Sequence, residues 1–405
     1  MRVPAMRKTW KTKLIHPDVQ APQGFQSLAS PVFRGSTVLF PNAAAVTDDW
    51  DQYEAGYTYG LYGTPTALEL AGRICELEHG YRTMLTPGGQ AAISLINFAL
   101  LKAGDHLLLP ESIYGPHRQF ACQVLTRFGI DVTFYAPTIG QSETSISNRG
   151  QAIQSLFRSN TRVIWCESPG SITMEIQDLP AIVAAAHQAG LMVALDNTWA
   201  AGIYFDALSH RVDITMQALT KYVGGHSDLL LGSITVQDEA VYHRLGLTHK
   251  LVGCAVSADD CSLALRGMKT LAVRLRHIEN AALQIAHWLA NRSEIELVLH
   301  PALASCPGHE IWKRDFTGSA GVFSIVFRQQ FTKPQVHAFV DALELFKIGY
   351  SWGGVTSLAV AYDFSSNPAR PGYGHRIVRL NIGLEDVEDL RTDLDQALQK
   401  MTSGG

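Results

Sequence analysis

Short apolar runs alternate with segments of helical spacing between residues 66 and 236. Strands are expected at residues 106–109, 132–135, 163–166, 191–195, 214–219 and 233–236. Helices are expected at residues 66–79, 90–104, 116–127 and 179–188, with Thr66 as the N-cap of the first. Apolar strands that alternate with helices are typical of a mostly parallel sheet covered on both faces. The pattern therefore predicts an α/β fold whose ligands bind beyond the carboxyl ends of the strands.

The pattern differs on either side of this region. The first 63 residues hold several prolines and few periodic runs, and they end in an aromatic, glycine-rich segment. Such an arm has little core of its own, so we expect it to pack on a second subunit. Beyond residue 268, a long helix (271–290) is followed by a mixture of strands and helices. We expect an N-terminal arm at residues 1–63, a large domain at residues 64–268 and a smaller C-terminal α+β domain at residues 269–405.

Charge, apolar runs and cysteines exclude several classes of protein. The net charge is −4 and the basic residues are scattered, which argues against nucleic-acid binding. The N-terminus lacks the apolar core of a signal peptide, and the apolar run at residues 91–101 is too short to span a bilayer. The six cysteines show neither a CxxC pair nor zinc-ligand spacing with histidine, so we expect reduced structural thiols and no metal. We expect a cytoplasmic protein without a membrane partner.

Two polar residues follow neighbouring apolar runs. Asp196 ends the run at 191–195, and Lys221 follows the run at 214–219. A lysine there could form an imine with an aldehyde, while the carboxylate keeps a pyridine nitrogen protonated, which is the chemistry of pyridoxal 5′-phosphate (PLP). Burial would lower the pKa of the lysine and favour its free amine. For isolated residues, a helix-capping aspartate and a solvated lysine are the alternatives.

Three further features suit such a site. Gly88 and Gly89 precede an apolar helix, whose free N–H groups can bind phosphate, although two glycines there are often only a turn. Tyr114 could stack on a ring or could be a core tyrosine. Arg379 lies in an apolar strand, where its guanidinium needs either a structural salt bridge or a substrate carboxylate.

Longer motifs occur in order along the chain: CESPGS at 166–171, DNTWAAG at 196–202, TKYVGGHSD at 220–228, WKRDFTG at 312–318, YSWGG at 350–354 and IGLED at 382–386. With these motifs the chain resembles the Cys/Met-metabolism family of PLP-dependent enzymes, and within it the bacterial cystathionine β-lyases, from about residue 36 to residue 390. The resemblance implies the PLP-dependent transferase fold (fold type I), with a mostly parallel seven-stranded sheet domain and a smaller α+β domain. It also implies a homotetramer built from two active dimers.

The resemblance also implies roles for individual residues. Those that would hold the cofactor are Lys221 by a covalent bond, Asp196 at the pyridine nitrogen, Tyr114 by stacking, Gly89 and Gln90 through backbone N–H groups, and Thr220 at the phosphate. Those that would hold the substrate carboxylate are Ser351 and Arg379, with Trp352 beside them. Tyr59 would reach in from the neighbouring subunit, and Lys221, Tyr114 and Tyr59 would be the catalytic residues.

Two positions depart from the family pattern. Leu61 stands where the family has an arginine that binds the phosphate of the partner subunit's PLP, and Lys250 stands where the β-lyases have a tyrosine. The implied reaction is β-elimination from L-cystathionine, giving homocysteine, pyruvate and ammonia. An amino-acid racemase, with Tyr59 or Tyr114 as the second acid, and another C–S lyase are the alternatives. An inactive relative that serves as a scaffold is a third, against which the retention of the lysine, aspartate and arginine argues.

Overall fold

The structure is a computed structural model that describes residues 8–16, 28–143, 145–366 and 372–403. Within these residues, the larger part is built on a seven-stranded sheet of order β1-β7-β6-β5-β4-β2-β3. Its strands are β1 (Arg82–Thr86), β2 (His106–Pro110), β3 (Asp131–Tyr135), β4 (Thr161–Glu167), β5 (Met192–Asp196), β6 (Ile214–Ala218) and β7 (Gly232–Val236). Among the described strands of this sheet, β7 runs antiparallel to its two neighbours, β1 and β6, and the other neighbouring pairs are parallel. The predicted mostly parallel sheet is confirmed.

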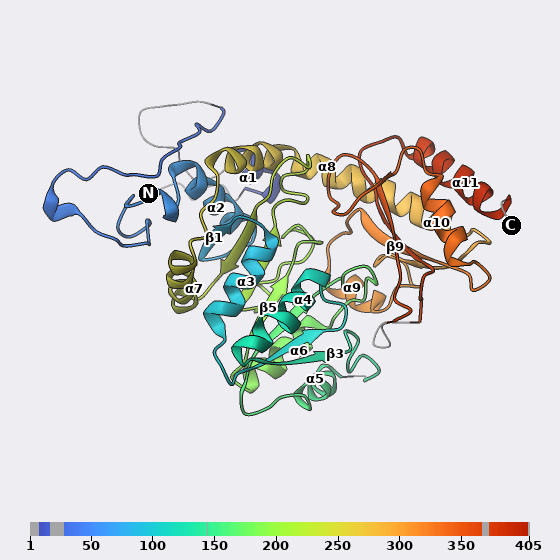
Figure 1. Ribbon diagram of the computed structural model, residues 1–405, viewed down its shortest axis with the longest axis horizontal. Coiled ribbons are helices and arrows are strands. Elements are labelled where there is room, and N and C mark those ends of the chain that lie inside the picture. The colour runs from blue at the N-terminus through green and yellow to red at the C-terminus, as the bar shows by residue number, and fades with distance from the viewer. Residues whose placement is uncertain (1–7, 17–27, 144, 367–371, 404–405) are drawn as a thin grey trace, which may run out of the picture.

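Helices cover both faces of this sheet (Figure 1). They are α2 (Pro65–Leu77), α3 (Gly89–Leu100), α4 (Gly115–Gln123), α5 (Ile146–Gln154), α6 (Leu179–Gln188) and α7 (Glu239–Val252). Side chains of one strand alternate between two apolar cores, because successive strand residues point to opposite faces. On β5, Val193 and Leu195 belong to one core and Ala194 to the other. This two-sided burial explains why the run at 191–195 is apolar throughout.

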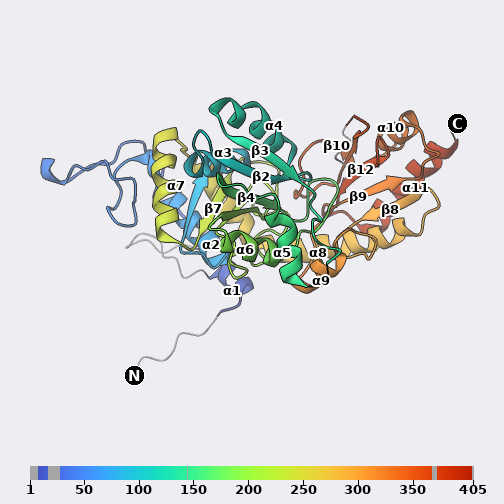
Figure 2. The ribbon, with the colours of Figure 1, turned by 90° about the horizontal axis from the view of Figure 1, so that it is seen from below.

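The C-terminal part has a second sheet, of order β10-β11-β12-β9-β8 among the described residues. Its strands are β8 (Ile295–Leu299), β9 (Val322–Phe327), β10 (Lys347–Ile348), β11 (Leu358–Tyr362) and β12 (Ile377–Asn381). The accompanying helices are α9 (His309–Asp315), α10 (Lys333–Asp341) and α11 (Val387–Ser403). Figure 2 shows this sheet at the opposite end of the molecule from the N-terminal arm.

One long helix joins the two parts. Helix α8 (Ala258–Ala290) runs without a break through residue 268, and Figure 1 shows it extending from the large sheet to the C-terminal sheet. Its Leu271 and Leu275 pack in the core of the large part, whereas Ile285 packs in that of the C-terminal part. The division of the chain at residues 63 and 268 stays a prediction, and its second boundary falls inside this helix.

The described part of the arm contains the short helix α1 (Trp10–Ile15) and two 3-10 turns, at Ala43–Ala45 and Gly60–Tyr62. Around the 3-10 turn at Ala43–Ala45 the arm extends away from the body in both views (Figures 1 and 2), whereas Asp51, Gln52 and Thr58 are buried. Several of its apolar side chains are exposed, among them Leu28, Leu39 and Val46, and exposed apolar residues gathered in one segment are typical of an interaction surface. Among the described residues, no helix is both long and apolar enough to cross a membrane.

Some local predictions were wrong. Thr64, not Thr66, is the residue before α2, and the Thr66 hydroxyl instead donates to the carbonyl of Pro31. Helix α4 ends at Gln123, and a 3-10 turn follows at Leu125–Phe128. Strands β1, β10 and β11 were not predicted, and in β1 the reason is that only Met84 and Leu85 are apolar.

Candidate functional site

A cavity of about 360 Å³ lies where the carboxyl ends of the parallel strands face the C-terminal part. This volume falls within the roughly 300–1,000 Å³ typical of small-molecule sites. Eight of the ten predicted site residues line it: Gly89, Gln90, Tyr114, Asp196, Thr220, Lys221, Trp352 and Arg379. The fold therefore collects residues from positions 89 to 379 around one space.

Lys221 follows β6 in a turn, and its amine donates a hydrogen bond to the hydroxyl of Ser351. The Lys221 Nζ lies 5.3 Å from the centroid of the Trp352 ring. Burial, together with the positive charge of Arg379, lowers the pKa of Lys221 to about 8, although the charge of Asp196 opposes this. A substantial fraction of the amine is therefore unprotonated near neutral pH, as a nucleophile or a base must be.

Asp196 is the last residue of β5. One of its carboxylate oxygens accepts hydrogen bonds from both the backbone N–H and the hydroxyl of Thr198. That hydroxyl accepts in turn from the N–H of Ala218, at 2.9 Å. Burial raises the pKa of Asp196, while the Thr198 hydrogen bonds and the charge of Lys221 act in the opposite direction. Thr198 was not among the predicted site residues, although a hydroxyl two residues after the aspartate is a local signal.

Arg379 lies on β12 and is only 9% exposed. Its Nη2 donates to the carbonyl of Ser351 at 3.0 Å, and its guanidinium carbon lies 5.5 Å from the centroid of the Tyr362 ring. Burial lowers the pKa of Arg379. Among the described residues, no carboxylate forms an ion pair with it, and a buried cation without a counter-ion is costly. The guanidinium is therefore suited to an anionic ligand.

Ser351 connects the two cations, although it is not among the residues that line the cavity. Its hydroxyl accepts from Lys221 and its carbonyl accepts from Arg379. The residue has a φ of +80°, which L-amino acids adopt at a cost, and this conformation lets one residue contact both. Because Ser351 contacts Arg379, it lies beside the group that is predicted to bind the substrate carboxylate.

The N-terminus of α3 forms another wall. Gly89 and Gln90 open this 12-residue helix, and the Gln90 Oε1 atom is buried without a hydrogen-bond partner among the described residues. A Cβ at Gly89 would lie 2.7 Å from the Cβ of Ala218, so this close approach to β6 requires glycine. The hydroxyl of Thr220 both donates to and accepts from the backbone of Leu231, at 3.1 Å. The free N–H groups of this helix end suit a phosphate.

Tyr114 directly precedes α4 and is 41% exposed. Its backbone N–H donates to the carboxylate of Glu167, and burial, followed by the charges of Asp196 and Glu167, raises the pKa of the Tyr114 phenol. Glu167 also lines the cavity, although it was not among the predicted site residues. Tyr59 is not among the lining residues of this chain, and it lies edge to face with Tyr62. Its predicted entry into a neighbouring subunit's site stays a prediction.

The two departures from the family pattern lie outside the cavity. Leu61 lines a smaller space between the arm and β1, together with Trp50 and Tyr62. Lys250 forms an ion pair with Asp48, and its Nζ lies 5.7 Å from the centroid of the Tyr62 ring. Within one chain, neither residue is placed at the N-terminus of α3.

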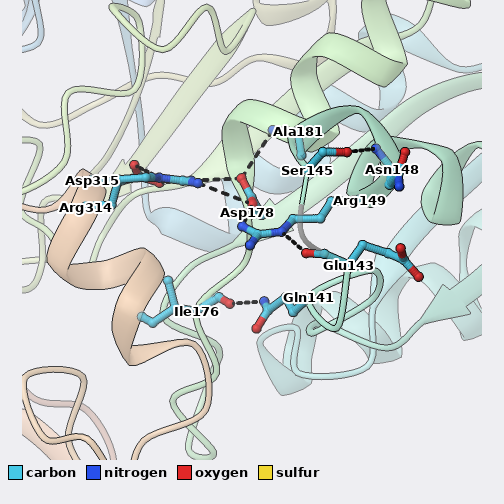
Figure 3. A network of polar contacts seen from close by, with 10 residues as sticks. All are labelled: Gln141, Glu143, Ser145, Asn148, Arg149, Ile176, Asp178, Ala181, Arg314 and Asp315. Carbon is cyan, nitrogen blue, oxygen red and sulfur yellow. Dashed lines mark hydrogen bonds and ion pairs between the residues drawn. The ribbon is translucent and has the colours of Figure 1, made fainter.

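An ion cluster joins the C-terminal part to the large part (Figure 3). Asp178, whose side chain is 2% exposed, precedes α6 and accepts from the backbone of Ala181. It also accepts from Arg149 of α5 at 2.7 Å and from Arg314 of α9 at 2.8 Å. One buried carboxylate thus holds three helices together.

The residues present fit PLP. The lysine amine suits an aldehyde, the buried aspartate suits a pyridinium and the helix N-terminus suits a phosphate, and all three border one cavity. The Gln90 Oε1 atom has no hydrogen-bond partner among the described residues, and no ion pair between Arg379 and a carboxylate is found among them, so both groups are available to a ligand.

Comparisons with known proteins agree with this fit. The model of the family "Cys/Met metabolism PLP-dependent enzyme" matches residues 11–399. The cystathionine β-lyase MetC of Escherichia coli is 36% identical to the chain over 402 residues, which cover 97% of this chain and 99% of that protein. The L-alanine/L-glutamate racemase of Wolbachia pipientis is 36% identical over 388 residues, 93% of each chain. The crystal structure of metB from Corynebacterium glutamicum superimposes with a TM-score of 0.86 at 27% identity, covering 97% of this chain and 98% of that one.

These findings confirm the predicted resemblance, the fold type and the dependence on PLP. The chain belongs to the PLP-dependent enzymes of cysteine and methionine metabolism.

Proposed function

We propose that this enzyme is a PLP-dependent carbon–sulfur β-lyase that cleaves L-cystathionine to homocysteine, pyruvate and ammonia. The observation that carries the proposal is the placement of Lys221, whose pKa is lowered, in one cavity with Asp196 and Arg379. A relative 36% identical over nearly its whole length bears the name of this activity. When bound, PLP supplies an electron sink for negative charge at the substrate Cα.

The residues of the chain supply binding and proton transfer. Arg379 binds the α-carboxylate, because its buried guanidinium lacks an anionic partner among the described residues. Lys221 removes the Cα proton as a free amine and delivers a proton to the sulfur that leaves from Cβ. Ser351 keeps this amine close to Arg379. Asp196 places a negative charge at the ring nitrogen of the cofactor.

The Lys221→Ala variant tests this function. Purified wild-type enzyme loaded with PLP should release pyruvate and a thiol in equal amounts from L-cystathionine, and the variant should lose at least 99.9% of that activity, as expected for loss of a general base worth roughly a thousandfold. Lys347→Ala, which changes an exposed lysine on β10, is the matched control and should keep full activity. Retained elimination in Lys221→Ala would refute the assignment.

Amino-acid racemisation is the second candidate, because a relative 36% identical to the chain is named a racemase. It requires a second acid on the other side of the substrate, and Tyr114 lines the cavity. Incubation with L-alanine, followed by chiral analysis, distinguishes the two reactions. D-alanine formed without any pyruvate from L-cystathionine would exclude the lyase.

We further propose that the enzyme works in the cytoplasm as a homotetramer in which Tyr59 enters the neighbouring active site. The exposed apolar side chains of the extended arm support the assembly. Light scattering gives the subunit number. Inactive Tyr59→Ala chains mixed with inactive Lys221→Ala chains should regain partial activity if Tyr59 acts between subunits.

A further inference from the structure

One wall of the cavity has an unusual backbone. Residues 169–172 and Met174 line the cavity between the large part and the C-terminal part. Ile172 has a φ of +71° and Met174 a φ of +58°. The left-handed region is rare for any L-residue and is an outlier for a β-branched one. Such a conformation persists only where its surroundings impose it.

The C-terminal part supplies three contacts that hold this wall. The hydroxyl of Ser324 donates to the carbonyl of Ile172 at 2.6 Å. The thiol of Cys306 donates to the carbonyl of Met174 at 3.3 Å, and the N–H of Ile176 donates to the carbonyl of Pro307 at 3.0 Å. The wall thus belongs to the large part in sequence but takes its shape from the C-terminal part.

Ser324 occupies a special place among these contacts. It lies in the middle of β9 with no exposed surface, and in the antiparallel ladder it is paired directly with Arg379 of β12. The residue that holds the carbonyl of Ile172 is therefore the strand neighbour of the guanidinium that faces the cavity. A shift of Ile172 away from Ser324 would change the distance between the wall and this guanidinium.

We propose that Ser324 is a positioning residue for substrate binding: through the carbonyl of Ile172, it fixes the wall at residues 169–174 against the strand that carries Arg379. The proposal rests on the proposed function, in which Arg379 binds the substrate carboxylate. Asp196 ends β5 and Lys221 follows β6, so neither residue belongs to this wall. Loss of the contact therefore weakens binding of the amino acid and leaves the proton-transfer groups in place.

Three variants separate this role from a general loss of stability. Ser324→Ala removes the hydrogen bond, and Ser324→Thr keeps a hydroxyl on a residue suited to a strand. Ser233→Ala is the matched control, because Ser233 of β7 also has no exposed surface, while its hydroxyl has no hydrogen-bond partner among the described residues. Ser233→Ala therefore removes a buried hydroxyl without removing a side-chain hydrogen bond found among the described residues.

Two measurements are made on each PLP-loaded enzyme. The first is amide hydrogen–deuterium exchange of the peptide that spans residues 169–177, whose amides at Gly170, Met174 and Ile176 form hydrogen bonds. The second is steady-state pyruvate release from L-cystathionine. For Ser324→Ala we expect faster exchange confined to this peptide and a KM raised roughly threefold to tenfold, the range for one net hydrogen bond, with kcat within twofold of the wild type.

Ser324→Thr should restore both values, and Ser233→Ala should match the wild type in both. Unchanged exchange in Ser324→Ala would overturn the proposal, as would a fall in kcat with an unchanged KM. A wild-type enzyme that releases no pyruvate would contradict the proposed function, and the exchange comparison would still decide whether Ser324 holds the wall.

Discussion

The free amine of Lys221 is expected to appear at a pH far below that of an ordinary lysine. With a pKa of about 8 instead of 10.5, about a quarter of the amine is unprotonated at pH 7.5, against about one part in a thousand for the ordinary lysine. The cofactor-free enzyme should therefore bind PLP covalently roughly two hundred times faster at this pH than an unperturbed lysine would. The rate should rise with pH and level off above a midpoint near 8.

The assay follows covalent attachment of PLP to cofactor-free enzyme after trapping with borohydride, at a series of pH values, with peptide mapping to locate the modified lysine. Replacing Arg379 with glutamine tests the cause. Burial is the larger cause of the lowered pKa, and the positive charge of Arg379 is the second, so its removal should move the midpoint to higher pH. Arg127→Gln, which changes an exposed arginine that does not line the cavity, is the control. A wild-type midpoint near 10, or a midpoint that falls in Arg379→Gln, would refute this reasoning.

Two substitutions test groups that support the site. Thr198→Val keeps the side-chain shape but removes a hydrogen bond to the ionised Asp196, so the acidic limb of the kcat profile should move about one pH unit upward. An unmoved limb would contradict this role. Asp178→Asn should lower the free energy of unfolding by roughly 2–4 kcal/mol at pH 7, because two arginines lose their buried partner. Although burial opposes it, hydrogen bonding to Arg314 and Arg149 holds the pKa of Asp178 below its usual value. This stability is therefore present above about pH 3.9 and is lost as the pH falls through the native pKa. The thermal midpoints of the two proteins should differ at pH 7, and the difference should shrink once the pH falls below the native pKa.

Much of the fold followed from local pattern. A strand buried on both faces is mostly apolar, so the run before Asp196, which is apolar throughout, was recognisable without any tertiary information. The run before Lys221 was recognisable from Ile214, Met216, Ala218 and Leu219, although it also contains the buried polar residues Thr215 and Gln217. Parallel strands then bring their carboxyl ends to the same edge, which placed the aspartate and the lysine together. Strand β1 escaped detection because arginine and threonine flank its only two apolar residues, Met84 and Leu85.

The amino-acid sequence by itself determined the sheet, the two polar residues at its edge and the family to which their motifs belong. Only the tertiary structure decided that Ser351 contacts both Lys221 and Arg379, and that the hydroxyl of Ser324 donates to the carbonyl of Ile172. The physical reason is that hydrophobic periodicity reports the burial of each residue along its own helix or strand. Contacts between residues more than a hundred positions apart depend instead on how two separately packed cores meet along α8, and no local pattern records that.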